Sequence, residues 1–235
     1  MSGHVSSCRA IVPMIQLFHV SKFYDRCTAL DDVSFRIDKG ECVILTGPSG
    51  AGKTTLLKVI FGAEIPDAGQ ILVQNRNIAR LRGGAIPYLR RTMGIVLQNF
   101  QLLSKKTVYD NVVLPLIIQG VKRREARTRV LDTLKAVSMD HKRTVRTGVL
   151  SAGEQQRICI ARAIVNSPIL LLADEPTGNL DAELAVEIVE LFKKIHAQGT
   201  TILLATHNQR VVEQMNGRVV HLQAGRVVSE EGAMS

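Results

Sequence analysis

The chain has 235 residues, of which 46% are hydrophobic and 4% aromatic, and it carries a formal net charge of +9. This length and apolar content suffice for one domain with its own core. The scarcity of aromatic side chains argues against a surface that stacks on nucleic-acid bases, so we expect no nucleic-acid partner. The longest apolar runs, residues 112–118 and 169–173, are far shorter than the roughly 18 residues of a membrane span, and residues 1–13 lack the apolar core of a secretion signal.

The positive charge is concentrated in one part of the chain. Residues 76–150 contain 16 Lys and Arg against four Asp and Glu, a net charge of +12, which leaves −3 for the remainder. Such segregation indicates a face that meets something anionic, either lipid headgroups or nucleic acid. The alternative is a helical face that only keeps the protein in solution.

The four cysteines are far apart and form no Cys-x-x-Cys pair. This spacing favours reduced thiols in a cytosolic protein, with no zinc or redox role. They are Cys8, Cys27, Cys42 and Cys159.

The first predicted elements are strands. Residues 1–13 precede a second methionine and are interpreted as a disordered or dispensable N-terminal tail. Strand-like alternation begins directly after Met14. Residues 41–46 form a short apolar, β-rich run, and residues 54–61 have a helical pattern that Gly62 ends.

The rest of the chain alternates between strands and helices. Further strands are predicted over 71–73, 94–97, 169–174 and 200–205, with helices over 151–165 and 182–197 and a short helix and a strand pair at the end. Residues 107–137 read as helical, in pieces separated by Pro115 and Gly120. The alternation predicts an α/β domain over residues 14–235, built on a mostly parallel sheet, with a helical subdomain inserted at about residues 99–165.

A glycine-rich loop with the pattern Gly-x-x-x-x-Gly-Lys-Thr separates the strand at 41–46 from the helix at 54–61. Its glycines allow backbone N–H groups to turn toward phosphates, assisted by the positive end of the following helix. Lys53 places a charge on the β- and γ-phosphates, and the Thr54 hydroxyl ligates Mg²⁺. The predicted nucleotide-binding residues of this Walker A loop are Gly47, Pro48, Ser49, Gly50, Ala51, Gly52, Lys53, Thr54 and Thr55.

Two neighbouring acids follow the buried strand at 169–174. Asp174, at the carboxyl end of the strand, can hold Mg²⁺, and Glu175 is placed to act as the general base on the attacking water. Such a pair alone is as often an ordinary helix N-cap. After a Walker A loop, a Walker B strand is the favoured interpretation.

Residues 150–155 read Leu-Ser-Ala-Gly-Glu-Gln and open a predicted helix. Ser151 can cap the helix, and Gly153 lets a phosphate approach the backbone. Because Glu154 follows Ser151 by three residues, the same run also fits an ordinary capping box, and physical reasoning alone leaves the two readings open.

The three motifs together resemble those of the ATP-binding-cassette (ABC) ATPases, in which two copies close head to tail and trap ATP. The resemblance covers residues 14–228 and implies a P-loop NTPase of the ABC ATPase type, with an antiparallel β part beside the parallel core. It implies that Ser151, Gly153 and Glu154 contact the nucleotide of the opposing chain. The run departs from the family pattern at Ala152, usually glycine, and at Glu154, usually glutamine. Because Gly153 is retained, we expect an active site.

Four further matches to the family pattern occur in order along the chain. Gln98 matches the residue that senses Mg²⁺ and links the core to the helical insertion, and Asp181 matches the loop that crosses the dimer interface. His207 matches the histidine that contacts the γ-phosphate, and Tyr24 matches the aromatic residue that stacks on adenine. Without the other motifs, a histidine or aromatic residue at these places would be read as packed or solvated.

Within the family, the cell-division branch, the FtsE ATPases, offers the nearest resemblance. It rests on residues 87–94, 107–112, 115–118, 153–157 and 161–166, whereas residues 173–181 are shared with exporters. It implies ATP and Mg²⁺ as cofactors, a homodimer in the ATP-bound state and an FtsX-like integral membrane subunit as partner. The protein would then sit peripherally on the cytoplasmic face of the inner membrane, with its basic helical subdomain near anionic lipid.

Two alternatives remain open. The first is the ATPase subunit of a lipoprotein-releasing or macrolide-type exporter, whose substrate path would lie in the partner. The second is a soluble ABC ATPase of DNA repair or translation. Proteins of that class usually carry a coiled-coil or zinc insert or a second cassette, and the sequence has none of these.

Overall fold

Two β-sheets organise the protein in a computed structural model that describes residues 13–25, 27–81 and 84–232. The predicted tail lies outside these residues except for Pro13, which begins the first strand and pairs with Asp38. No helix in the described segments combines the length and apolar character needed to cross a bilayer.

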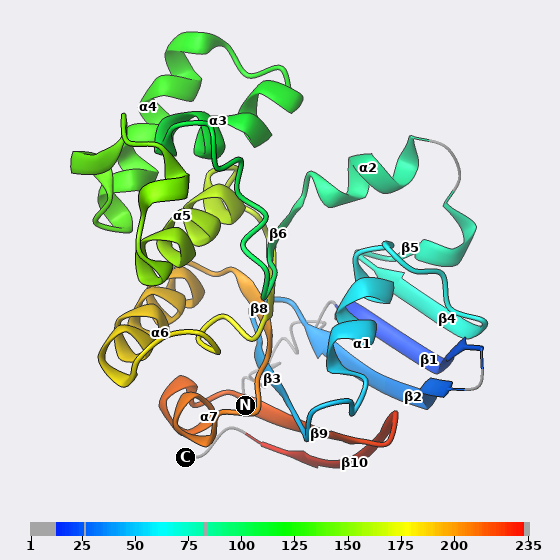
Figure 1. The fold of residues 1–235 in the computed structure, drawn as a ribbon. Coiled ribbons are helices and arrows are strands. Elements are labelled where there is room, and N and C mark those ends of the chain that lie inside the picture. Colours follow the sequence, from blue (N-terminus) through cyan, green and yellow to red (C-terminus); the bar gives the residue numbers. More distant parts are fainter. Residues whose placement is uncertain (1–12, 26, 82–83, 233–235) are drawn as a thin grey trace, which may run out of the picture.

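The smaller sheet is antiparallel and lies at the right in Figure 1. Its buried side chains pack in one cluster with those of helix α1 (Lys53–Ile60). In spatial order its strands are β2 (Cys27–Asp38), β1 (Pro13–Tyr24), β4 (Ala68–Val73) and β5 (Arg76–Asn77).

The larger sheet has a parallel core with one antiparallel edge strand, as expected from the alternating pattern. Its central strands are continuously apolar because both faces are covered, and parallel strands end at the same sheet edge. The loops that follow the parallel strands therefore meet there. In spatial order the strands are β10 (Arg226–Glu231), β9 (Arg218–Gln223), β3 (Cys42–Thr46), β8 (Thr201–Ala205), β7 (Leu170–Asp174) and β6 (Met93–Val96).

Most helices lie on the other side of the molecule from the antiparallel sheet (Figure 1). Helices α3, α4 and α5 fall within the predicted helical range 99–165 and pack on one another. The helices after α1 are α2 (Ala85–Arg90), α3 (Val108–Ile118), α4 (Arg123–Ala136), α5 (Ala152–Ile164), α6 (Ala182–Ala197) and α7 (Gln209–Met215). Short 3₁₀ turns occupy Ile78–Arg80, Asp140–Lys142 and Thr147–Val149.

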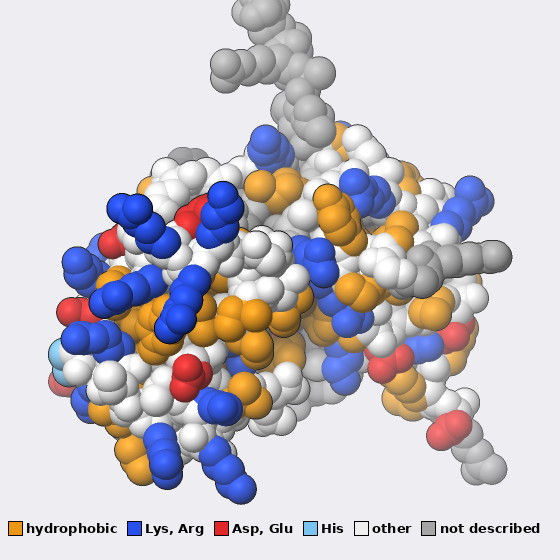
Figure 2. Space-filling view, turned by 90° about the horizontal axis from the view of Figure 1, so that it is seen from above, with side chains coloured by type: hydrophobic (Ala, Val, Ile, Leu, Met, Phe, Trp, Pro, Cys, Tyr) orange, Lys and Arg blue, Asp and Glu red, His pale blue; other side chains and the backbone are white. Residues whose placement is uncertain are grey.

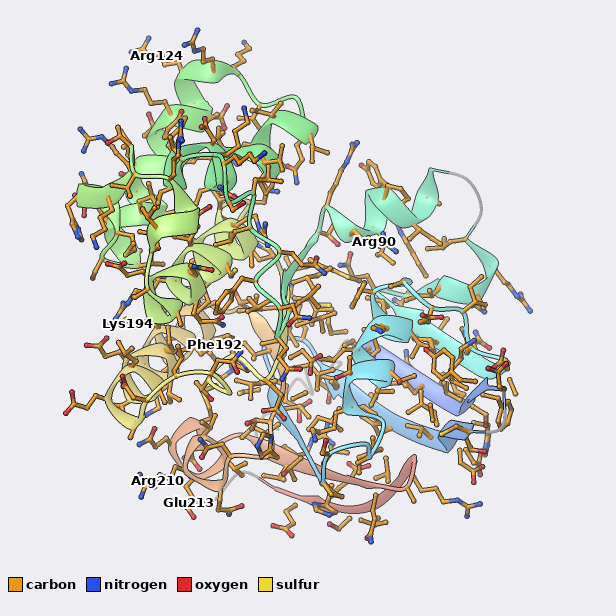
Figure 3. All side chains as sticks on the ribbon, viewed as in Figure 1. Arg90, Arg124, Phe192, Lys194, Arg210 and Glu213 are labelled. Atoms are coloured by element: carbon orange, nitrogen blue, oxygen red, sulfur yellow. The ribbon has the colours of Figure 1, made fainter. Side chains whose placement is uncertain are left out.

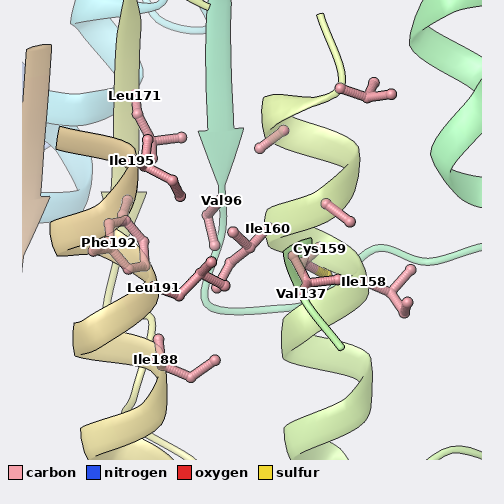
Figure 4. Close-up of a cluster of buried hydrophobic side chains, with 14 of the residues drawn as sticks. Val96, Val137, Ile158, Cys159, Ile160, Leu171, Ile188, Leu191, Phe192 and Ile195 are labelled. Atoms are coloured by element: carbon pink, nitrogen blue, oxygen red, sulfur yellow. The ribbon is translucent and has the colours of Figure 1, made fainter. Parts of the chain in front are cut away.

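An apolar cluster joins α5 and α6 to the parallel sheet (Figure 4). Phe192 of α6 is fully buried and points toward the sheet (Figure 3), beside Ile195 and Leu171. Fully burying one such side chain contributes about 1.5–3 kcal/mol. This cluster fixes α5, whose N-cap is Ser151, relative to strand β7.

Pro115 does not break the predicted helix. It lies inside α3, and the helical pattern continues past it because the N–H of Gln119 donates to the Pro115 carbonyl at 3.2 Å. Burial of Val112 and Leu116 against the core outweighs the one hydrogen bond that proline removes. The break comes at Gly120, whose φ of 73° lies in the left-handed region.

Candidate nucleotide-binding site

A cavity of about 260 Å³ lies where the loops after the parallel strands meet α1. It unites most of the predicted Walker A loop with five residues from other parts of the chain, three of which were predicted. Its lining consists of Cys27, Ala29, Ser49, Gly50, Ala51, Gly52, Lys53, Thr54, Thr55, Gln98, Glu175 and His207. Cys27 and Ala29 were not predicted, because neither residue type suggests nucleotide binding.

The Walker A loop is held in a conformation that only glycine allows. Gly47 has a φ of 144°, and a Cβ there would lie 2.0 Å from the Leu222 carbonyl oxygen. Gly52, at φ 103°, precedes α1 and provides no side-chain cap. The first N–H groups of α1 therefore lack a side-chain acceptor, an arrangement that favours an anion.

Lys53 is almost entirely buried, with 7% of its surface exposed. Its Nζ donates to the carbonyl oxygens of Gly47 at 2.8 Å and Pro48 at 3.1 Å, and lies 3.8 Å from Oε1 of Glu175. The loop thus carries a positive charge at its centre, beside the cavity.

Glu175 begins the loop after β7, and several neighbouring residues hold its backbone and side chain in place. Its φ of 45° is unusual for a residue with a side chain. Its N–H donates to the Ala205 carbonyl at 2.9 Å, and its Oε1 lies 2.7 Å from Nδ1 of His207. The hydroxyl of Thr206 donates to its other oxygen, Oε2, at 3.1 Å. These contacts aim the carboxylate into the cavity.

Sequence reasoning missed Thr206. This residue is fully buried, and its hydroxyl also accepts from the N–H of Asn208 at 3.1 Å. A polar residue at the end of an apolar strand, directly before a predicted functional histidine, was the available signal.

Asp174 fits a cation. It is 3% exposed, and its Oδ1 has no hydrogen-bond partner among the described residues. Burial raises the pKa of this carboxyl, and a hydrogen bond from Thr54 opposes that rise. The described residues hold no group of three or more His, Cys, Asp or Glu side chains that could bind a metal by themselves. A cation here would therefore share its coordination with phosphate oxygens.

Residues 150–155, which match the family pattern at the start of α5, do not line this cavity. The hydroxyl oxygen of Ser151 caps α5 by accepting from the N–H of Glu154 at 3.3 Å. The carboxylate of Glu154 in turn accepts from the N–H of Ser151 at 3.1 Å, so both hydrogen bonds of the capping box are present. Glu154 also pairs with Lys142, whose hydrogen bond is the main cause that lowers the pKa of Glu154. Ser151 and Ala152 are exposed.

Gly153 is needed for packing within the chain itself. A Cβ there would lie 2.7 Å from Cδ1 of Leu184 on α6. The space left by the missing side chain is therefore filled by Leu184, whereas Ser151 and Ala152 before it are exposed.

Two predicted residues have other local partners. Tyr24 ends β1, is 39% exposed and lies 5.4 Å from Nζ of Lys22, measured to its ring centre. The pKa of Tyr24 is raised mainly by burial and, to a smaller extent, by the negative charge of Glu64. Asp181 caps α6 by accepting from the N–H of Leu184 at 2.9 Å. Neither residue lines the cavity described above.

Comparisons with known proteins agree with this geometry. The ABC transporter family profile matches residues 30–178. The cell division ATP-binding protein FtsE of Mycobacterium tuberculosis is 48% identical over 221 residues, covering 93% of this chain and 96% of that protein. FtsE of Escherichia coli is 46% identical over 215 residues, covering 91% and 97%.

Solved structures show the same architecture. A dimeric structure of the ATP-binding cassette MJ0796, in a post-hydrolysis state with ADP and Pi, has a TM-score of 0.88 at 34% identity, covering 94% of this chain and 100% of that one. A cassette of the cbiONQ transporter complex from Clostridium perfringens, cbiO1, has a TM-score of 0.86 at 32% identity, covering 94% and 89%. The fold, the loop geometry and these similarities together show that the chain belongs to the ATP-binding ATPases of the ABC transporter family, in its FtsE branch.

Proposed function

We propose that this ATPase acts in cell division as a homodimer bound to an FtsX-like integral membrane subunit. The protein then lies on the cytoplasmic face of the inner membrane, and ATP-driven closure of the dimer changes the shape of the partner. Similarity to FtsE proteins over more than nine-tenths of the chain supports this role over that of a lipoprotein or macrolide exporter subunit.

One observation carries the proposal: the nucleotide site of a single chain is incomplete. Among the described residues that line the cavity, none belongs to the run 150–155. Ser151 and Ala152, at the N-terminus of α5, are exposed, and in the dimer they would meet the phosphates held by a second chain. The dimeric state of the MJ0796 cassette with ADP and Pi supports the same arrangement.

Each residue of the site then has a role. Lys53 and the N-terminus of α1 bind the phosphates of ATP. Thr54, Gln98 and Asp174 would hold Mg²⁺, whose charge neutralises the β- and γ-phosphates when it is bound.

The residues that follow β7 and β8 carry out the hydrolysis. Glu175 accepts the proton of the attacking water, and His207 steadies the phosphate that is transferred. Hydrolysis removes the charge that holds the two chains together. ATP thus acts as a ligand with higher affinity for the closed state.

The outer end of the helical region provides a face for the membrane and the partner. Leu114, Ile117 and Ile118 of α3 are exposed, and Arg123 and Arg124 begin α4 close by in sequence. Figure 2 shows many Lys and Arg side chains around apolar patches on this side, and Arg124 points away from the sheets in Figure 3. Near anionic lipid each such residue contributes about 1 kcal/mol.

The dimer is tested with the Glu175→Gln variant. It should bind ATP without turnover and double its mass in light scattering when ATP is added, because closure no longer ends in hydrolysis. A Glu175→Gln, Lys53→Ala double variant, which lacks the phosphate charge, should stay monomeric. A Glu175→Gln protein that remains monomeric with saturating ATP would overturn the head-to-tail scheme.

The cellular role is tested by purification from membranes of the native host. The tagged chain should bring down an integral membrane subunit, and Lys53→Ala should give filamentous cells. Loss of lipoprotein release or macrolide resistance with normal division would instead favour an exporter. Salt-resistant binding to duplex DNA, in competition with anionic vesicles, would favour the soluble DNA-repair class.

A further inference from the structure

Gln98 lies on a segment that has little backbone support. The β6 ladder ends at Val96, and the amides of residues 98–102 make no backbone hydrogen bond in the described part of the chain. Gln101 has a φ of 48°, in the left-handed region, which is strained for a residue with a side chain. Contacts from outside this segment must therefore stabilise its backbone conformation.

That support comes from α5. Arg162 donates from Nη1 to the Gln101 carbonyl at 2.7 Å and from Nη2 to the Phe100 carbonyl at 2.9 Å. The thiol of Cys159, one turn earlier, donates to the same Phe100 carbonyl at 3.1 Å. A guanidinium is a rigid planar fork, so two bonds to adjacent carbonyls fix the direction of the backbone as well as its position.

Arg162 also faces a second site. It lines an apolar groove of about 350 Å³ between α2, β6, α3 and α5, together with Pro115, Ile118 and Gln119. Gln98, by contrast, lines the nucleotide cavity. One side chain therefore contacts both the groove and the segment that carries Gln98.

We propose that Arg162 is a positioning residue for Gln98. Its guanidinium sets the path of residues 98–101 so that the Gln98 amide reaches the nucleotide cavity. The inference rests on the role that the proposed function gives to Gln98, and it assigns Arg162 no contact with ATP.

The test is a double-mutant cycle on steady-state ATP hydrolysis with Arg162→Gln and Gln98→Ala. Arg162→Gln alone should lower kcat by roughly ten- to a hundredfold, the range expected when a reacting group is misplaced by about 1 Å, and should change KM for ATP by less than about twofold. In the Gln98→Ala background the same substitution should change kcat by less than about twofold, because its effect passes through Gln98.

Arg162→Lys covers the case in which Arg162→Gln fails to fold. Lysine keeps the charge but cannot hold two carbonyls in a fixed geometry, so kcat should be intermediate. Hydrogen exchange of a peptide spanning residues 96–104 should also be faster than in the native protein. Arg157→Gln is the matched control, because Arg157 on the same helix donates to the Val137 carbonyl and pairs with Glu187, away from both cavities.

The outcomes separate the two claims. If Gln98→Ala leaves hydrolysis intact, the proposed role of Gln98 is wrong, and the inference about Arg162 is wrong as well. A different outcome is that Gln98→Ala and Arg162→Gln each lower kcat, with the double variant showing the product of the two effects, as a general structural defect would give. In that case Arg162 does not act through Gln98, although the role of Gln98 stands. An equal response of the Arg157 variant within the cycle also overturns the inference.

Discussion

Nδ1 of His207 lies 2.7 Å from Oε1 of Glu175, so the end of β8 and the end of β7 are joined across the nucleotide cavity. The same carboxylate oxygen lies 3.8 Å from Nζ of Lys53. Among the described residues, Glu175 is thus a carboxylate that lies beside both His207 and Lys53. An incoming γ-phosphate would compete with it for His207 and Lys53, which frees the carboxylate to meet water.

His207→Ala should lower kcat by about a hundredfold, the scale for losing one preorganised donor at a developing charge. Phosphate release at saturating ATP measures this. His196→Ala is the control, because the His196 ring contacts the Gly40 carbonyl outside the cavity, and it should retain at least half of the native rate. Equal activity of the two variants would remove His207 from the mechanism.

Thr206→Val should lower kcat by roughly tenfold, since valine keeps the shape but leaves an oxygen of Glu175 without its donor. Thr206→Ser keeps the hydroxyl and should restore most of the rate. The comparison is decisive because a pure packing defect predicts the opposite order, with valine tolerated better than the smaller serine.

Glu154→Gln should make stability less dependent on pH. The Lys142 hydrogen bond lowers the folded pKa of Glu154 below its ordinary value of 4.5, so the ionised carboxylate stabilises the fold above that pH and loses this effect as the pH falls through the folded value. Because both side chains are partly exposed, the gain at pH 7 is below about 1 kcal/mol.

Urea unfolding of the native and Glu154→Gln proteins should therefore differ at pH 7, with the gap closing below pH 4.5. Hydrolysis should persist, since glutamine is the usual family residue here. Glu190→Gln, which breaks an exposed pair with Lys193, serves as the control and should change stability by less than about 0.5 kcal/mol. A gap that widens in acid contradicts the assignment.

Gly94→Ala should destabilise the protein by about 1–3 kcal/mol or more, because a Cβ there would lie 2.6 Å from the Ala163 carbonyl oxygen and 2.8 Å from Leu171. Thermal unfolding measures the loss. Gly84→Ala is the control, since a Cβ at that position would meet no non-neighbouring atom of the described residues within 4 Å. A native melting temperature for Gly94→Ala would show that β6 and α5 pack less closely than described.

Local sequence patterns predicted much of the architecture. Continuous apolar runs marked β3, β7 and β8, and the helix expected over 182–197 is α6 with the same bounds. Pro115 was misread because its effect on a helix depends on what the neighbouring side chains bury. Residues 112 and 116 reach the core only once α5 is in place.

The sequence by itself determined the phosphate loop, since glycine conformations and a lysine at fixed spacing are properties of a few consecutive residues. It also determined which strands are buried, because hydrophobicity is local. Only the tertiary structure decided that Thr206 supports Glu175, that Arg162 holds residues 100–101, and that Leu184 fills the space at Gly153. These contacts join residues about 30 to 60 positions apart, and such partners are chosen by the packing of whole elements, which no short pattern encodes.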